Sequence, residues 1–168
     1  PVKFQENSEL LQSNAFIDSS GTGSNSGIKK TCSKTVILGV AESDAHVVAN
    51  KLIEARLEAS GYEVVNLGAC TPLSEFGQAY ENHPESVAIL IGTLNGHALQ
   101  DLSDLLWMKQ KFAVNCPVIV GGKLGLSPGK AQRVGQTLLN RGVDALINDI
   151  EDVLSYIQQG QYGLAKTG

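Results

Sequence analysis

The residues of this chain best suited to chemistry are Asp44 and His46, which follow the apolar run TVILGV at 35–40. That run is too short for a helix and rich in β-branched residues, so it predicts a buried parallel strand. The next segment predicts a helix over 46–60, which places the Asp-x-His pair at the strand's carboxyl end, where open α/β sheets bind ligands. There, a histidine can offer one ring nitrogen to a metal while a carboxylate holds the other. The alternative for Ser43 and Asp44 is a plain helix N-cap.

Composition limits the classes of function. A length of 168 residues with 42% hydrophobic residues suits one domain with a sizeable core. The net charge is −4 and no basic cluster exceeds Lys29 and Lys30, which argues against nucleic acid or a membrane as partner. The apolar stretches are strand-sized, far short of a membrane span. The three cysteines are widely spaced and form no C-x-x-C pair, so we expect neither a zinc site nor a disulfide framework. This use of cysteine predicts a cytoplasmic location.

The chain divides into an extension and a regular domain. Residues 1–33 include a Gly- and Ser-rich stretch at 19–27 and predict a flexible extension or linker. Residues 34–160 predict the domain, and 161–168 a short tail. Strand candidates at 36–40, 63–67, 87–91, 118–120 and 145–147 alternate with helix-length stretches at 46–60, 72–82, 98–112, 128–141 and 150–159. This alternation predicts a flavodoxin-like α/β fold: a five-stranded parallel sheet of order 2-1-3-4-5 with helices on both faces.

Two helices carry apolar patterns that predict core positions. In the helix over 46–60 the predicted core stripe consists of Val48, Leu52, Ile53, Ala55, Leu57 and Ala59. In the helix over 98–112, Trp107 is also predicted to be core, and the alternative is that an exposed Trp107 marks a partner surface. His97 has two interpretations, as a residue facing a ligand or as the start of this helix.

Three loops are expected to meet at the carboxyl edge of the sheet. They are residues 43–46 (SDAH), 92–97 (GTLNGH) and 121–125 (GGKLG). Their glycines let a ligand approach the backbone closely. Flavin phosphate is the rival ligand for such an edge, but the first loop lacks the hydroxyl- and Gly-rich run that cradles a phosphate, and no nucleotide-binding Gly motif occurs in the chain.

The motifs Asp44-x-His46-x-x-Ala49, Gly92-Thr93-Leu94 and Gly121-Gly122 resemble those of cobalamin-binding domains, whose pattern runs DxHxxG, SxL, GG. Over residues 34–147 the chain is similar in particular to the small, cobalamin-binding subunits of glutamate mutase. The resemblance implies adenosylcobalamin as cofactor, His46 as cobalt ligand and Asp44 on the other ring nitrogen. The cofactor-binding residues that it implies are Ser43, Asp44, Ala45, His46, Val47, Ala49, Gly92, Thr93, Leu94, Gly121, Gly122, Lys123 and Leu124.

The resemblance also implies an activity and a partner. The cofactor carries radical chemistry for the conversion of glutamate to 3-methylaspartate, and no residue of this chain is assigned a catalytic role. The substrate would lie in a separate, larger barrel subunit, since a barrel needs about 250 residues. The alternatives are a non-catalytic cobalamin carrier or sensor, and a flavodoxin-like module that has lost its cofactor.

Three positions depart from the family pattern. Ala49 replaces a glycine and adds a methyl group to the slot implied for the cofactor's nucleotide tail. Gly92 replaces a serine and removes a hydroxyl, for which Thr93 is the neighbouring substitute. Residues 148–150 read Asn-Asp-Ile where Pro-Gly-Thr is expected. These departures bear on the affinity for the tail more than on cobalt ligation.

Overall fold

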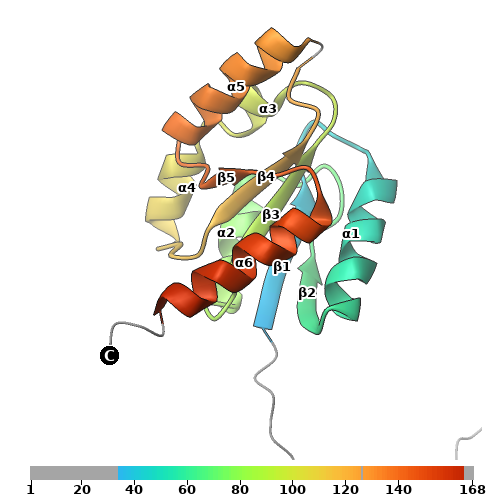
Figure 1. The fold of residues 1–168 in the computed structure, drawn as a ribbon. Helices are drawn as coiled ribbons and strands as arrows, with labels where there is room; N and C mark the ends of the chain where they lie inside the picture. Colours follow the sequence, from blue (N-terminus) through green and yellow to red (C-terminus); the bar gives the residue numbers. More distant parts are fainter. Residues whose placement is uncertain (1–33, 126, 165–168) are drawn as a thin grey trace, which may run out of the picture. The chain divides into compact units, whose positions relative to one another are not determined.

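The computed structural model describes residues 34–125 and 127–164. The predicted extension over 1–33 and the last four residues of the predicted tail lie outside this range. The strands are β1 (Lys34–Val40), β2 (Tyr62–Asn66), β3 (Ala88–Thr93), β4 (Val118–Gly122) and β5 (Ala145–Leu146). The helices are α1 (Val47–Ala59), α2 (Leu73–Asn82), α3 (Ala98–Asp101), α4 (Leu105–Lys111), α5 (Pro128–Asn140) and α6 (Ile150–Leu164), as labelled in Figure 1.

The sheet has five parallel strands in the order β2-β1-β3-β4-β5, which confirms the predicted topology. Its register aligns the ends of three strands, because Val40 pairs with Gly92 and Gly92 pairs with Gly121. The loops that follow β1, β3 and β4 therefore leave the sheet at the same level. This alignment brings the Asp-x-His loop beside the other two predicted site loops.

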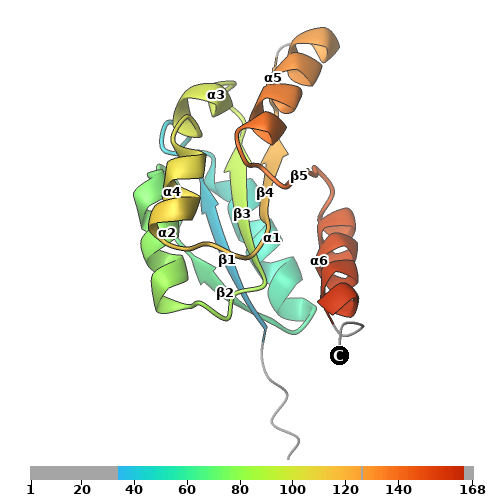
Figure 2. The same ribbon diagram turned by 90° about the vertical axis from the view of Figure 1, so that its left-hand side faces the viewer.

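Helices cover both faces of the sheet (Figure 2). Successive strand residues point to opposite faces, so Ile37 joins one core cluster while Val36 and Leu38 join the other. The cluster with Ile37 contains buried side chains of α2, α3, α4 and α5. The cluster with Val36 and Leu38 contains Leu57 of α1 and three side chains of α6. The predicted site loops lie at the end of the sheet between these two layers.

The prediction of a core stripe along α1 is wrong for most of its residues. Val48 is 72% exposed and Leu52 is 68% exposed, and Ala55 and Ala59 are also exposed, whereas Leu57 is fully buried. Val48, Ala55 and Ala59 belong to neither core cluster, because α1 turns a different face toward the sheet, that of Asn50, Ile53 and Leu57. Packing beneath the first half of α1 is also incomplete. A cavity, rather than packed side chains, separates this part of the helix from the sheet, and Leu52 lines that cavity.

The single helix predicted over 98–112 is in fact the two helices α3 and α4. The backbone N–H of Ser103 bonds to the carbonyl of Gln100, and that of Leu105 to the carbonyl of Leu102, so the chain tightens to a three-residue spacing. Ser103 and Asp104 favour helix ends over helix interiors. Trp107, predicted to be core, is 55% exposed, with the Lys111 ammonium 4.7 Å from its ring centre.

Within the described part of the chain, no helix combines the length and the apolar character that crossing a membrane requires.

Candidate functional site

A cavity of about 430 Å³ lies between the sheet, the first half of α1 and the start of α6. Its volume falls in the range of about 300–1,000 Å³ that is typical of small-molecule sites. Leu38, Leu90 and Ile119 of the three central strands form part of its apolar wall. Of the predicted site residues, the cavity is lined by His46, Ala49, Gly92, Thr93, Leu94, Gly121 and Gly122. The cavity therefore joins residues from all three predicted loops.

Asp44 is the polar centre of the loop after β1. Its side chain is almost fully buried, and its carboxylate accepts four hydrogen bonds. Oδ1 accepts from the backbone N–H of His46 at 3.0 Å and lies 2.5 Å from His46 Nδ1. Oδ2 accepts from the backbone N–H groups of Leu94 and Asn95. Asp44 thus joins the loop after β1 to the loop after β3 and holds the His46 ring at the same time.

These bonds also set the charge of Asp44. Burial alone would raise the pKa of the carboxyl, but the hydrogen bonds from the Leu94 N–H and from His46 outweigh burial and hold the pKa below its usual value. Asp44 is therefore a carboxylate at neutral pH.

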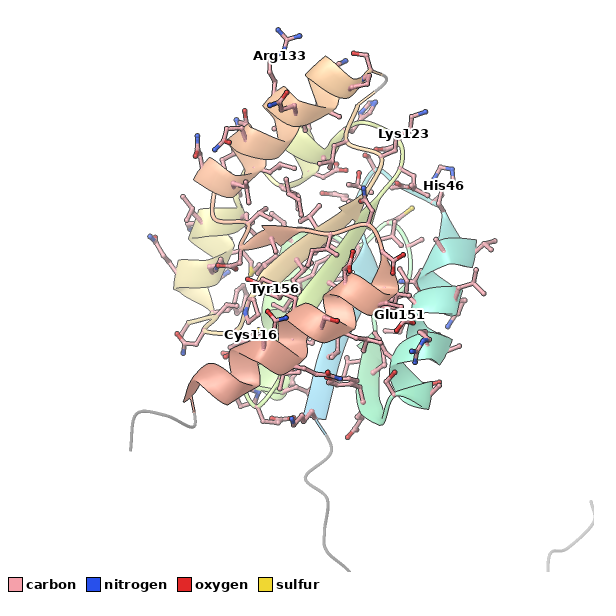
Figure 3. All side chains as sticks on the ribbon, in the orientation of Figure 1. His46, Cys116, Lys123, Arg133, Glu151 and Tyr156 are labelled. Atoms are coloured by element: carbon pink, nitrogen blue, oxygen red, sulfur yellow. The ribbon has the colours of Figure 1, made fainter. Side chains whose placement is uncertain are left out.

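The His46 ring is oriented by this carboxylate. An ionised carboxylate only accepts hydrogen bonds, so Nδ1 of His46 carries a hydrogen, and in the neutral imidazole the lone pair is on Nε2. The side chain is 60% exposed and stands at the end of the sheet that also carries Lys123 (Figure 3). Over the described residues, no group of three or more His, Cys, Asp and Glu side chains is placed to hold a metal ion. A single imidazole with a free Nε2 suits a metal that arrives with its other ligands already in place.

Ser43 braces the same loop instead of capping α1. Its hydroxyl donates to Asp101 at 2.7 Å and accepts from the side-chain amide of Asn95 at 2.6 Å. The first turn of α1 has no side-chain cap, so the N-cap alternative for Ser43 and Asp44 is wrong. Both side chains are used to connect loops.

The glycine pair at the end of β4 is required by the chain's own backbone. Gly122 has a φ of +119°, and a Cβ there would lie 2.0 Å from the carbonyl oxygen of Thr93. A Cβ on Gly121 would lie 2.5 Å from the carbonyl oxygen of Ile147. Gly92 differs, because the nearest atoms to an added Cβ are 3.8 Å away. The serine of the family pattern therefore has room at position 92.

The other predicted site residues lie outside the cavity lining. Ala45 and Val47 are exposed beside His46, and Lys123 is exposed on the loop after β4. Leu124 is half-buried and packs against the core cluster that contains α5. His97 is exposed and directly precedes α3, also outside the lining.

Sequence reasoning missed several residues of the cavity. The most informative is Asn50, which is buried on α1 four positions after His46. A spacing of four residues places two side chains on the same side of a helix, so the sequence could have indicated that Asn50 lies near His46. The start of α6 and the turn before it also contribute lining residues, namely Ile147, Asn148, Asp149, Ile150 and Val153.

Two buried side-chain polar atoms of the described residues have no hydrogen-bond partner, and both belong to cavity residues. They are Nδ2 of Asn50 and Oγ1 of Thr93. Leaving a buried donor unpaired costs about 1–3 kcal/mol, so such atoms are typical of a site completed by a ligand. The cavity therefore fits a ligand that is largely apolar but carries polar atoms along its length.

The fold and cavity first define a class, the flavodoxin-like α/β domains with a site at the carboxyl edge. Solved structures of similar fold include a cobalamin-binding protein from Desulfitobacterium hafniense (TM-score 0.60, 20% identity, 75% of this chain and 58% of that chain). They also include the methanol:cobalamin methyltransferase complex MtaBC from Methanosarcina barkeri (TM-score 0.62, 21% identity, 85% and 51%). This chain thus spans little more than half the length of those two. A signal receiver domain from Vibrio parahaemolyticus aligns at a TM-score of 0.55 with 12% identity, covering 81% of this chain and 98% of that one.

Sequence comparison is more specific. The chain is 36% identical over 119 residues to glutamate mutase sigma subunit 2 of Haloarcula marismortui, covering 71% of this chain and 80% of that protein. It is 30% identical over 115 residues to the sigma subunit of Fusobacterium nucleatum, covering 67% and 83%. No protein-family model matches the sequence. The chain belongs to the glutamate mutase sigma subunit family.

Proposed function

We propose that this chain is the cobalamin-binding component of an isomerase of the glutamate mutase type, with His46 as the protein ligand of cobalt. The observation that carries the proposal is the Asp44–His46 pair, which leaves Nε2 of an oriented imidazole free at the rim of a cavity. A corrin brings nitrogen ligands of its own, so the imidazole of His46 would be enough to hold its cobalt without a cluster of side chains.

The cavity suits the nucleotide tail of the cofactor. Its apolar wall of Leu38, Leu90 and Ile119 matches a flat aromatic base. The unpartnered hydroxyl of Thr93 offers a hydrogen bond to the polar part of the tail.

The chain's own part in the reaction is to hold and orient the cofactor. Asp44 keeps the hydrogen on Nδ1 of His46 and the lone pair on Nε2, which sets the direction and the basicity of the cobalt ligand. When bound, adenosylcobalamin supplies the radical chemistry that rearranges the carbon skeleton of the substrate. We propose glutamate as substrate, held by a larger barrel subunit. The cytoplasmic location stays a prediction from the cysteine spacing.

Spectroscopy of bound cobalamin tests the ligand. Protein labelled with 15N-histidine is mixed with cobalamin in its Co(II) form, and the paramagnetic spectrum is recorded for the wild type and for His46→Ala. We expect coupling from a protein nitrogen in the wild type and its loss in the variant. His83→Ala, at the end of α2, is the matched control and keeps the coupling. Coupling that persists in His46→Ala contradicts the assignment.

The partner is tested separately. A glutamate mutase large subunit, adenosylcobalamin and glutamate are expected to yield 3-methylaspartate only when this chain is added. Turnover by the chain alone contradicts the two-subunit proposal. Cobalamin binding without turnover with any such partner favours the carrier alternative.

A further inference from the structure

The side chain of Asn50 carries a hydrogen-bond donor that the protein itself does not use. Asn50 is 3% exposed, lines the cavity from α1, and its Nδ2 has no partner among the described residues. Its other terminal atom, Oδ1, accepts a hydrogen bond of 2.8 Å from Nδ2 of Asn66.

The orientation of both amides follows from one backbone group. The N–H of Gly68 can only donate, and it lies 2.9 Å from Oδ1 of Asn66. The oxygen of Asn66 must therefore face Gly68, so its NH₂ group faces Asn50. Asn50 in turn must present its oxygen to Asn66 and its NH₂ group elsewhere.

Asn66 cannot relieve the unused donor. Its oxygen faces Gly68, away from Asn50, and its amide hydrogens serve Asn50 and Glu54. The pKa of Glu54 is lowered, first by the hydrogen bond from Lys51 and also by the hydrogen bond from Asn66. The unused hydrogen-bonding capacity of Asn50, a residue of the cavity lining, is therefore that of a donor and not of an acceptor.

The position of Asn50 relative to His46 indicates what it meets. His46 directly precedes α1 and Asn50 is the fourth residue of that helix, so Asn50 lies about 6 Å further along the helix axis. A ligand anchored at His46 that extends into the cavity passes Asn50.

We propose that Asn50 donates a hydrogen bond to an acceptor atom of the nucleotide tail, and so selects complete corrinoids over those that lack the tail. This proposal rests on the proposed function, because it takes the cavity to be the tail site. Asn50 acts in binding specificity; Asn66 and Gly68 act as positioning groups that set its direction.

Binding titrations with two probes test the proposal. Aquocobalamin carries the tail, and cobinamide is the same corrin without it. The variant Asn50→Asp keeps the size and the acceptor for Asn66 but removes the donor. We expect it to weaken aquocobalamin binding by about 10-fold or more and to leave cobinamide binding within about 2-fold of wild type. The variant Asn50→Ser, which restores a donor, is expected to recover part of the loss.

The controls separate recognition from folding. Unchanged cobinamide binding shows that each variant is folded and that His46 is in place. Asn82→Asp, on the exposed end of α2, is the matched control and changes neither affinity. A pseudocobalamin with adenine as tail base identifies the acceptor. If Asn50→Asp weakens binding of aquocobalamin and of pseudocobalamin equally, the acceptor is in the ribose–phosphate. If the two losses of affinity differ, the acceptor is on the base.

The titrations distinguish a failure of the proposed function from a failure of the role proposed for Asn50. A wild type that binds neither probe overturns the proposed function, and this inference with it. A wild type that binds both, with Asn50→Asp unchanged or weakened equally for both probes, overturns only the role of Asn50.

Discussion

The carboxylate of Asp44 accepts the backbone N–H of Leu94, which lies fifty positions later in the chain. The same carboxylate holds Nδ1 of His46. One buried side chain therefore fixes both the packing of two site loops and the direction of the imidazole. Four predictions follow from this and from neighbouring contacts of the site.

Replacing Asp44 by asparagine is expected to weaken cobalamin binding by about 10–100-fold, the usual effect of losing a partner of a metal-bound histidine. The amide NH₂ also faces backbone N–H groups, so we expect the free energy of unfolding to fall by about 1–3 kcal/mol. Cobalamin titration and urea unfolding measure the two effects. Asp152→Asn, on the exposed side of α6, serves as control. Wild-type affinity in Asp44→Asn would leave Asp44 with a purely structural role.

The lowered pKa of Asp44 makes stability depend on pH in a defined direction. In acid the unfolded chain binds a proton at Asp44 before the folded chain does, so lowering the pH favours unfolding. The contribution of Asp44 is complete above its ordinary pKa of about 3.9 and is lost as the pH falls through the lower, folded-state value. We expect the difference in unfolding free energy between wild type and Asp44→Asn to shrink as the pH falls below about 4 toward pH 2–3. Parallel curves over the whole range would contradict this.

Gly92→Ser is expected to fold normally, because its Cβ meets nothing nearer than 3.8 Å, and to strengthen cobalamin binding by restoring a hydroxyl. Thr93→Val tests whether the hydroxyl of Thr93 replaces the missing serine hydroxyl in binding cobalamin. It is expected to weaken binding in the wild type and to weaken it less in the Gly92→Ser background, a coupling that a double-mutant cycle measures. Additive effects in the cycle would mean that the two hydroxyls serve different groups.

Gly122→Ala is expected to destabilise the fold. The left-handed backbone alone costs about 1–3 kcal/mol for a residue with a side chain, and the contact with Thr93 O at 2.0 Å adds to this. Gly129→Ala is the matched control, since a Cβ there meets nothing within 4 Å and alanine favours the helix α5. We expect the control to be neutral or stabilising in urea unfolding. A Gly122→Ala variant as stable as wild type would mean that the backbone can relax there at little cost.

The periodicity of the sequence was sufficient to predict the strand order of the sheet. Strand-length apolar runs separated by helix-length segments have few packed solutions, and the order β2-β1-β3-β4-β5 is the one expected for five such units. The same topology implies that the ends of β1, β3 and β4 meet at one edge of the sheet. The sequence alone therefore predicts that Asp44, His46 and Gly92 lie close together. The motif spacing likewise identified the family to which the chain belongs.

The burial of α1 and the role of the glycines could not be predicted in this way. Apolar residues at helical spacing predict a core face, but they do not reveal that a cavity replaces the core beneath Leu52. The sequence motif presents Gly92 and Gly122 alike, whereas only Gly122 is required by a neighbouring backbone carbonyl. The pattern of apolar residues along a helix or strand indicates which side of that element a side chain occupies. What it meets there depends on the elements packed against it.

Asn50 illustrates the same limit at the site. From the sequence it is one polar residue on a helix, four positions after His46 and within the part of the chain that resembles the family. Its character as a donor is decided by Asn66 and Gly68, which reach it from β2 and the loop beyond. The sequence alone determined the fold, the family and the Asp-x-His pair, because these depend on spacing along the chain. The tertiary structure decided the cavity and the direction of Asn50, because these depend on hydrogen bonds between segments distant in the sequence.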